Sequence, residues 1–179
     1  MDTKSATFIR VQEGRELTSY QDIAGVWTIG DGSTMYQTGI RVGPNETITD
    51  AQADALRDWE IDRKTKVINN LLNGVELTEH QMVALISFTY NMGVGALQQS
   101  TLFKVIKQDP NSTKIILIAD VTDKSVKDWM QKNNWLSVNE ITMWFMVWNK
   151  VKNPVTKVKE FSEAILQRRL REAKMYLTA

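Results

Sequence analysis

Two carboxylates and one hydroxyl stand near the amino end of the chain, at Glu13, Asp22 and Thr28, with eight and then five residues between them. General acid–base hydrolysis uses such groups to donate a proton, to activate water and to hold that water in place. The spacing alone does not establish a site, because carboxylates a few residues apart on a chain are mostly solvated surface groups.

The surrounding residues predict the elements that position this set. Residues 5–13 carry several apolar side chains and stop at Gly14, a good helix terminator, so Glu13 is expected in the last turn of a short helix. Six of the nine glycines fall between residues 14 and 43, so this stretch must turn often. It is expected to hold short strands near residues 17–21, 26–30 and 36–42.

The rest of the chain reads as helical. Capping boxes predict helix starts at Thr49 to Gln52, Thr78 to Gln81 and Ser137 to Glu140. The first opens a long helix, and the other two open helices that run to about Met92 and about Lys150. Further helices are expected near residues 101–108, 112–120, 124–133 and 157–177.

The predicted fold class is therefore α+β, in a single domain of residues 1–179. A small lobe with a short antiparallel β-sheet, residues 14–48, is expected beside a larger all-helical lobe of residues 1–13 and about 75–179. Residues 50–73 form the connecting helix, and a cleft is expected between the lobes.

Composition excludes several classes of function. The 22 basic and 21 acidic residues give a net charge of +1, so no global field draws the protein to nucleic acid or to anionic membranes. The absence of cysteine excludes thiolate metal sites, and the single histidine, His80, lies at a helix start without partners, so no metal or cofactor is expected. No apolar run approaches the roughly 20 residues of a spanning helix, and no signal-peptide core is visible, so neither membrane insertion nor self-export is expected.

Three blocks of sequence frame the polar set and continue along the chain. The first is Glu13-Gly14, Tyr20-Gln21-Asp22 and Gly25 to Gly32, the second runs from Gln81 to Leu102, and the third holds Arg168, Arg169, Glu172, Tyr176 and Leu177. In this order they resemble the phage-type lysozymes, the T4-like and P22-like endolysins among the glycoside hydrolases. The resemblance covers nearly the whole chain except about residues 109–142.

The chain departs from the family pattern in three places. Asp31 stands where the family usually has an uncharged residue, and Ser33 stands where it has histidine. That histidine looks structural in relatives, so its absence affects a local contact more than the reaction. Residues 151–155 replace a Gly-Gly of the family, so that edge of the groove is expected to differ.

The resemblance implies a lysozyme-like fold and hydrolysis of the β-1,4 bond between N-acetylmuramic acid and N-acetylglucosamine in peptidoglycan. Glu13 is then the general acid, kept protonated by its partly apolar surroundings. Asp22, in a wetter hairpin, stays ionised, and Thr28 holds the attacking water. Relatives invert the anomeric centre, which implies that Asp22 is the base.

The same resemblance implies a setting and partners. A phage endolysin is made in the host cytoplasm and acts on the periplasmic wall after release, with glycan strands as its substrate. The protein is expected to be a monomer. Because no export signal is visible, release through a holin-type pore is expected.

Further residues are expected in the substrate groove. By the resemblance, Thr34, Tyr90, Asn91 and Ser100 contact saccharide, although a serine ahead of a helical pattern caps the helix first, so a cap is favoured for Ser100. Trp27, beside Thr28, is the tryptophan with the best case for substrate contact; the apolar stripes favour core positions for Trp129, Trp144 and Trp148.

Charged residues outside the set favour structural interpretations. Asp31 is expected to be an exposed turn carboxylate, which is favoured over crowding of Glu13 or Asp22. Arg168 and Arg169 are expected either to be solvated or to be ligands for the acidic wall, and the resemblance implies a structural ion pair with Glu160 or Glu172.

Two other functions stay open. A lytic transglycosylase would form an anhydro product without water, but it would have no use for a water-positioning pair such as Asp22 and Thr28. A non-catalytic wall-binding or phage structural module could keep the same fold, because a fold does not guarantee its chemistry.

Overall fold

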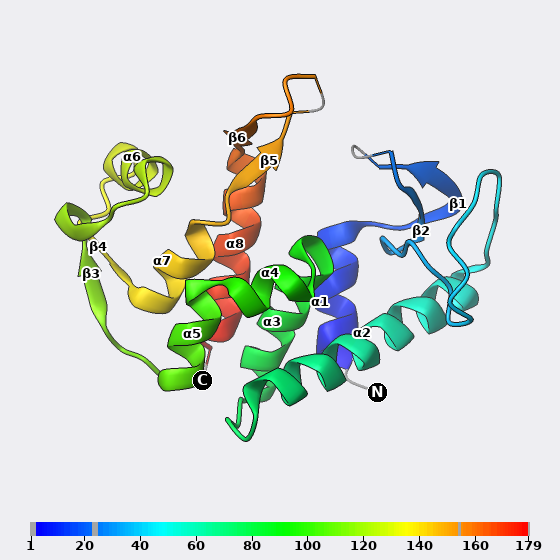
Figure 1. The fold of residues 1–179 in the computed structure, drawn as a ribbon, viewed down its shortest axis with the longest axis horizontal. Helices are drawn as coiled ribbons and strands as arrows, with labels where there is room; N and C mark the ends of the chain where they lie inside the picture. Colours follow the sequence, from blue (N-terminus) through cyan, green and yellow to red (C-terminus); the bar gives the residue numbers. More distant parts are fainter. Residues whose placement is uncertain (1–2, 23–24, 154, 179) are drawn as a thin grey trace. The chain divides into compact units, whose positions relative to one another are not determined.

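The computed structural model describes residues 3–22, 25–153 and 155–178, which fall into two compact units, residues 1–70 and 71–179 (Figure 1). The long helix α2 (Asp50–Leu72) crosses the boundary between them. The predicted grouping of residues 1–13 with the carboxy-terminal helices stays a prediction, as does the cleft. Of the helices in the described part of the chain, none has the length and apolar character of a membrane span.

The first unit contains helix α1 (Thr3–Glu13), the hairpin of β1 (Glu16–Gln21) and β2 (Trp27–Gly30), and most of α2. Gly14 follows α1 with a φ of 74° and donates its amide to the Arg10 carbonyl at 3.1 Å, which ends the helix at Glu13 as predicted. The strands are antiparallel, with Tyr20 opposite Thr28.

A small apolar core supports this hairpin. Ile29, Val42 and Leu56 are buried, and partly buried aromatic and aliphatic side chains surround them: Trp27, Tyr36, Ile48 and Trp59. The predicted capping box at the start of α2 is present, because the Thr49 amide donates to Gln52 at 2.8 Å and the Gln52 amide donates to Thr49 Oγ1 at 3.2 Å.

The strand predicted at residues 36–42 is wrong. This segment folds into turns, with the Tyr36 amide bonded to the Ile40 carbonyl at 2.8 Å and an isolated bridge between Met35 and Arg41. Ile40 is 65% exposed and only Val42 of the segment is buried, so the apolar face that would hold a strand on the core is lacking.

The second unit is mostly helical. Its helices are α3 (Glu79–Met92), α4 (Val94–Gln99), α5 (Thr101–Gln108), η1 (Ile118–Asp120), α6 (Lys124–Lys132), α7 (Glu140–Met146) and α8 (Glu163–Tyr176). The capping box predicted at Thr78 opens α3, and α8 packs against both α3 and α7. The contact between α3 and α8 joins the second motif block, which begins on α3, to the third, which lies on α8. The two blocks therefore pack against each other.

This unit is not all-helical as predicted, because it holds two short strand pairs. Strands β3 (Ile115–Leu117) and β4 (Ser137–Asn139) pair where helices were expected at residues 112–120 and from Ser137. Strands β5 (Lys150–Lys152) and β6 (Lys159–Phe161) pair antiparallel, so α8 begins at Glu163 and not near Lys157. The β-branched residues of these segments favour extended backbone once a partner strand is available.

The helix starts shift accordingly. Asn139, and not Ser137, caps α7, since its Oδ1 accepts from the Ile141 amide at 2.8 Å.

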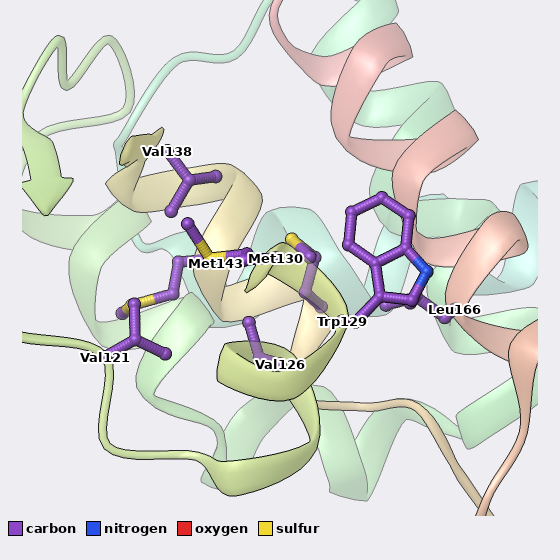
Figure 2. Packing of buried hydrophobic residues seen from close by; sticks show 8 residues of the cluster. Val121, Val126, Trp129, Met130, Val138, Met143 and Leu166 are labelled. Atoms are coloured by element: carbon purple, nitrogen blue, oxygen red, sulfur yellow. The ribbon is translucent and has the colours of Figure 1, made fainter. Parts of the chain in front are cut away.

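A separate apolar cluster joins α6, α7 and α8. Figure 2 shows its side chains, which belong to Val121, Val126, Trp129, Met130, Val138, Met143, Met146 and Leu166. Residues 109–142, which matched no family block, are thus anchored by a core of their own.

Candidate active site

Glu13 lies at the end of α1 with its carboxylate against Gly32, in the turn after β2. A Cβ atom built on Gly32 would lie 3.6 Å from Glu13 Oε2 and 3.8 Å from its Cγ, and Gly32 has a φ of +93°. Any other residue would be strained by this φ, and its Cβ would lie in ordinary van der Waals contact with the carboxylate. Glu13 is half-buried, between the bulk solvent and the turn.

Asp22 follows β1 and shapes the hairpin turn. Its Oδ1 accepts from the Val26 amide at 2.8 Å, and its own amide donates to the Val26 carbonyl at 3.0 Å. The side chain is exposed. The exposed position matches the wetter environment expected for Asp22.

Thr28 is 4% exposed and lies on β2 opposite Tyr20. Its hydroxyl donates to the Val26 carbonyl at 3.0 Å. Because that proton is in use, Thr28 Oγ1 can only accept from a further partner, such as a water molecule.

Tyr20 links the three residues. Burial raises the pKa of Tyr20, and the negative charges of Glu13, Asp22 and Glu16 raise it further. Both carboxylates therefore lie within electrostatic reach of a phenol whose cross-strand neighbour is Thr28. Asp22 and Thr28 are joined through the backbone of Val26, and the grouping of Glu13 with them as acid, base and hydroxyl stays a prediction.

This proximity predicts a change in the titration of Tyr20. In Glu13→Gln the phenolate loses a neighbouring negative charge that disfavours it, so the pKa of Tyr20 should fall. The titration is followed by NMR of the Tyr20 ring. The exposed carboxylate of Glu79, at the start of α3, is the control, and Glu79→Gln should leave Tyr20 unchanged. An unaltered pKa in Glu13→Gln would mean that the carboxylate is not beside Tyr20.

The prediction that Asp31 is exposed is wrong: the residue is 1% exposed. Its two oxygens accept from Arg15, Oδ1 from Nε at 2.7 Å and Oδ2 from Nη2 at 2.8 Å, and Arg57 Nη1 lies 3.3 Å from Oδ2. A carboxylate is buried at acceptable cost only when it is paired in this way. Its two arginine partners are remote in sequence, so the type of residue 31 alone could not reveal its burial.

Arg15 and Arg57 extend this cluster to α2. Asp54 accepts from Arg15 at 2.6 Å and from Arg57 at 2.8 Å. The hydrogen bond from Arg15 is the largest cause that lowers the pKa of Asp54.

Ser33 follows Asp31 by two residues and is buried, and its hydroxyl has no hydrogen-bond partner among the described residues.

The other predicted groove residues divide between the units. Thr34 lies in the first unit, exposed, and its carbonyl accepts from the Val42 amide. In the second unit, Ser100 caps α5 as favoured, accepting from the Phe103 amide at 3.0 Å. Asn91 is exposed near the end of α3 and Tyr90 is half-buried beside it. Nothing in these local positions conflicts with sugar binding by Asn91.

A buried ion cluster holds Asn91. Its Oδ1 accepts from Arg169 Nη2 at 2.9 Å, and Glu172 lies 3.1 Å from Arg168 and 3.3 Å from Arg169. Ser87 donates to Glu172 at 2.7 Å. The predicted pairing of the two arginines with Glu172 is confirmed. Pairing with Glu160 is wrong, because that residue lies in the β5–β6 hairpin and accepts from Asn153.

The tryptophans are less uniformly buried than predicted. Trp129 belongs to the core, and its indole nitrogen donates to Glu163 at 3.0 Å. Trp144 and Trp148 are half-buried and line a pocket of about 400 Å³ together with Ser100, Lys150 and Lys159, among others. Trp27 packs on the core of the first unit.

No cluster of three or more His, Asp or Glu side chains in the described ranges is arranged to hold a metal ion. Glu13 and Asp22 are carboxylates that can transfer protons, and the Thr28 hydroxyl can accept from a water molecule. Sequence reasoning missed Tyr20, Arg15 and Arg57. The first two could have been noticed, since they belong to or adjoin the first motif block.

Comparisons with known proteins show what the chain is similar to. The profile of the family described as phage lysozyme matches residues 10–134. An endolysin from Acyrthosiphon pisum secondary endosymbiont phage 1 is 36% identical over 101 residues, 56% of this chain and 65% of that protein. A SAR-endolysin from Bacteriophage PS119 is 34% identical over 96 residues, 54% of each protein. The matches thus span about half to two thirds of the length of these curated relatives.

A solved structure extends the likeness along the whole chain. The endolysin from Escherichia coli O157:H7 phage FAHEc1 superposes with a TM-score of 0.73 at 28% sequence identity, covering 98% of this chain and 92% of that one. The predicted α+β, lysozyme-like fold is confirmed.

Proposed function

Because this chain belongs to the phage lysozyme family, we propose that it is an endolysin that hydrolyses bacterial peptidoglycan during phage lysis. The bond cleaved is the β-1,4 bond between N-acetylmuramic acid and N-acetylglucosamine. The observation that carries the proposal is the hairpin after Glu13, in which the side chains of Asp22 and Thr28 both bond to the backbone of Val26. The relatives' own names, endolysin and SAR-endolysin, point the same way.

Glu13 acts as the general acid. Its carboxyl proton passes to the glycosidic oxygen as the bond to the anomeric carbon breaks, leaving an oxocarbenium-like centre and a Glu13 carboxylate. Its place at the end of α1, facing the turn that bears Gly32, supports this role. Exchange with solvent afterwards returns the proton to Glu13.

Asp22 and Thr28 act on water. A water molecule donates to Thr28 Oγ1, whose own proton is used by Val26, and attacks the anomeric carbon while its proton passes to Asp22. The Val26 amide holds Asp22 in a fixed orientation. Attack from the face opposite the leaving group inverts the anomeric centre.

Substrate contacts outside this set are also proposed. Thr34 in the first unit and Tyr90 and Asn91 in the second contact the glycan. Ser100 caps α5 and also lines the pocket beside Trp144 and Trp148, so it can cap the helix and contact substrate in that pocket. No cofactor is required by these steps.

The setting follows from the substrate. We propose that the protein is a monomer made in the host cytoplasm, that it reaches the periplasmic wall after release, and that a holin-type pore provides the route. Neither nucleic acid nor membrane insertion has a part in this function.

Product analysis tests the proposal. Purified peptidoglycan digested in heavy-oxygen water should yield fragments whose new muramic acid ends are reducing and carry one oxygen from the solvent, detected by mass spectrometry. Anhydromuramic ends without solvent oxygen would identify a lytic transglycosylase. If the protein sediments with purified walls but releases no fragments, it is a non-catalytic binding module.

A further inference from the structure

We propose that the Arg15–Asp31 ion pair is a positioning device for Glu13, the acid of the proposed function on which this inference rests. The pair joins the two turns that meet at the Glu13 carboxylate. Arg15 follows Glu13 by two residues, and Asp31 directly precedes Gly32, whose Cα faces that carboxylate. Neither residue is among the family's signature positions, and the family usually has an uncharged residue at position 31.

Gly14 and Gly32 both have positive φ, 74° and 93°. Backbone hydrogen bonds close each turn, from the Gly14 amide to the Arg10 carbonyl at 3.1 Å and between Ile29 and Ser33 at 2.9 Å, and the ion pair adds a side-chain link between the two turns. The Arg15 guanidinium spans them through two parallel bonds of 2.7 and 2.8 Å to Asp31. A bidentate pair fixes orientation as well as distance, which a single bond does not.

Burial makes this tie strong. The Asp31 side chain is 0% exposed and that of Arg15 is 10% exposed, so solvent screens the pair little. A surface pair of the same residues would contribute little rigidity.

Asp54 and Arg57 anchor the cluster on α2. Arg57 Nη1 lies 3.3 Å from Asp31, and Asp54 accepts from both arginines, at 2.6 Å from Arg15 and 2.8 Å from Arg57. The turn that bears Gly32 is thus fixed to a long helix and not only to the short strand β2. Because a misplacement of about 1 Å can cost about 100-fold in rate, small motions of this turn should matter to Glu13.

Three variants separate positioning from stability. In Asp31→Asn and in Arg15→Lys the bidentate bond is lost, and the turnover number kcat should fall about 10- to 100-fold with KM little changed. The double variant Arg15→Met with Asp31→Leu replaces the buried pair by apolar side chains, which commonly restores stability but not orientation. It should melt near the wild-type temperature and still show the reduced kcat.

A matched control lies on α2. Glu60 is buried and paired with Lys64 at 2.9 Å, so Glu60→Gln disrupts a buried ion pair of the same unit that is separate from the Arg15–Asp31 pair. It should lower the melting temperature and leave kcat unchanged. If the double variant has the wild-type kcat, or if Glu60→Gln lowers kcat as much as Asp31→Asn does, the positioning role is wrong.

The Tyr20 titration gives a readout that does not depend on activity. Displacement of Glu13 should lower the raised pKa of Tyr20 in the double variant, and Glu60→Gln should not change it. The comparison with Glu13→Gln keeps the two ideas apart. If Glu13→Gln is fully active, the proposed function is wrong. If Glu13→Gln loses activity but the Arg15 and Asp31 variants keep the wild-type kcat and the wild-type Tyr20 titration, only the positioning role is wrong.

Discussion

Glu13→Gln is expected to lower the rate of peptidoglycan cleavage by about 100- to 10,000-fold, the usual contribution of a general acid. Glutamine keeps nearly the volume of glutamate, so the contact with Gly32 should survive while the transferable proton is lost. Clearing of permeabilised bacteria and release of reducing ends from purified walls both measure the effect.

The matched control is Glu16→Gln. Glu16 lies on β1 three positions from Glu13 and is exposed, so this variant makes the same change of charge in the same region. It should clear bacteria at close to the wild-type rate, and circular dichroism should show that both variants are folded. Equal clearing by Glu13→Gln and the wild type would reject Glu13 as the acid.

Glu172→Ala is expected to lower the free energy of unfolding by about 3–5 kcal/mol, because it leaves two arginines buried without their counter-charge. Glu172 and Arg169 are both 0% exposed, and Ser87 would also lose its acceptor. Urea denaturation followed by tryptophan fluorescence measures the change.

An exposed residue of the same helix is the comparison for this effect. Lys174 lies in the last turn of α8, and Lys174→Ala should change the free energy of unfolding by about 0.5 kcal/mol or less. A small loss of stability in Glu172→Ala would mean that the arginines find other partners. Because Arg169 donates to Asn91, the same variant should also weaken any glycan contact that Asn91 makes.

The local signals in the sequence predicted the parts of the fold that depend on local physics. Gly14 ends α1, and the capping boxes at Thr49 and Thr78 open α2 and α3, because caps depend on residues three apart. The β1–β2 hairpin was also predicted, since its turn is marked by Asp22 and Gly25.

Non-local pairing could not be predicted in the same way. Ile115 to Leu117 become a strand only because residues 137–139 lie beside them, twenty residues further along the chain. The segment 150–161 likewise forms a hairpin in place of helix ends. Short apolar or mixed segments carry no period long enough to distinguish strand from helix.

The candidate site shows the same division. The resemblance of the surrounding motif blocks pointed to Glu13, Asp22 and Thr28, which lie at the end of α1 and in the hairpin that follows it. What the sequence did not reveal is the support around them: Asp31 seemed exposed by its type and is buried between two arginines. Asp31 pairs with Arg15 and Arg57, which are 16 and 26 positions away in the sequence, so no local sequence pattern indicates these ion pairs.

The anomeric configuration of the first product tests the account most directly. Asp22 and Thr28 are proposed to hold a water molecule on the face opposite the bond that Glu13 protonates, and that geometry inverts the centre. Proton NMR during early cleavage of a soluble glycan should therefore show the α-anomer at the new reducing end before mutarotation. A β-anomer, or an anhydro product with no reducing end, would contradict the roles given to Asp22 and Thr28.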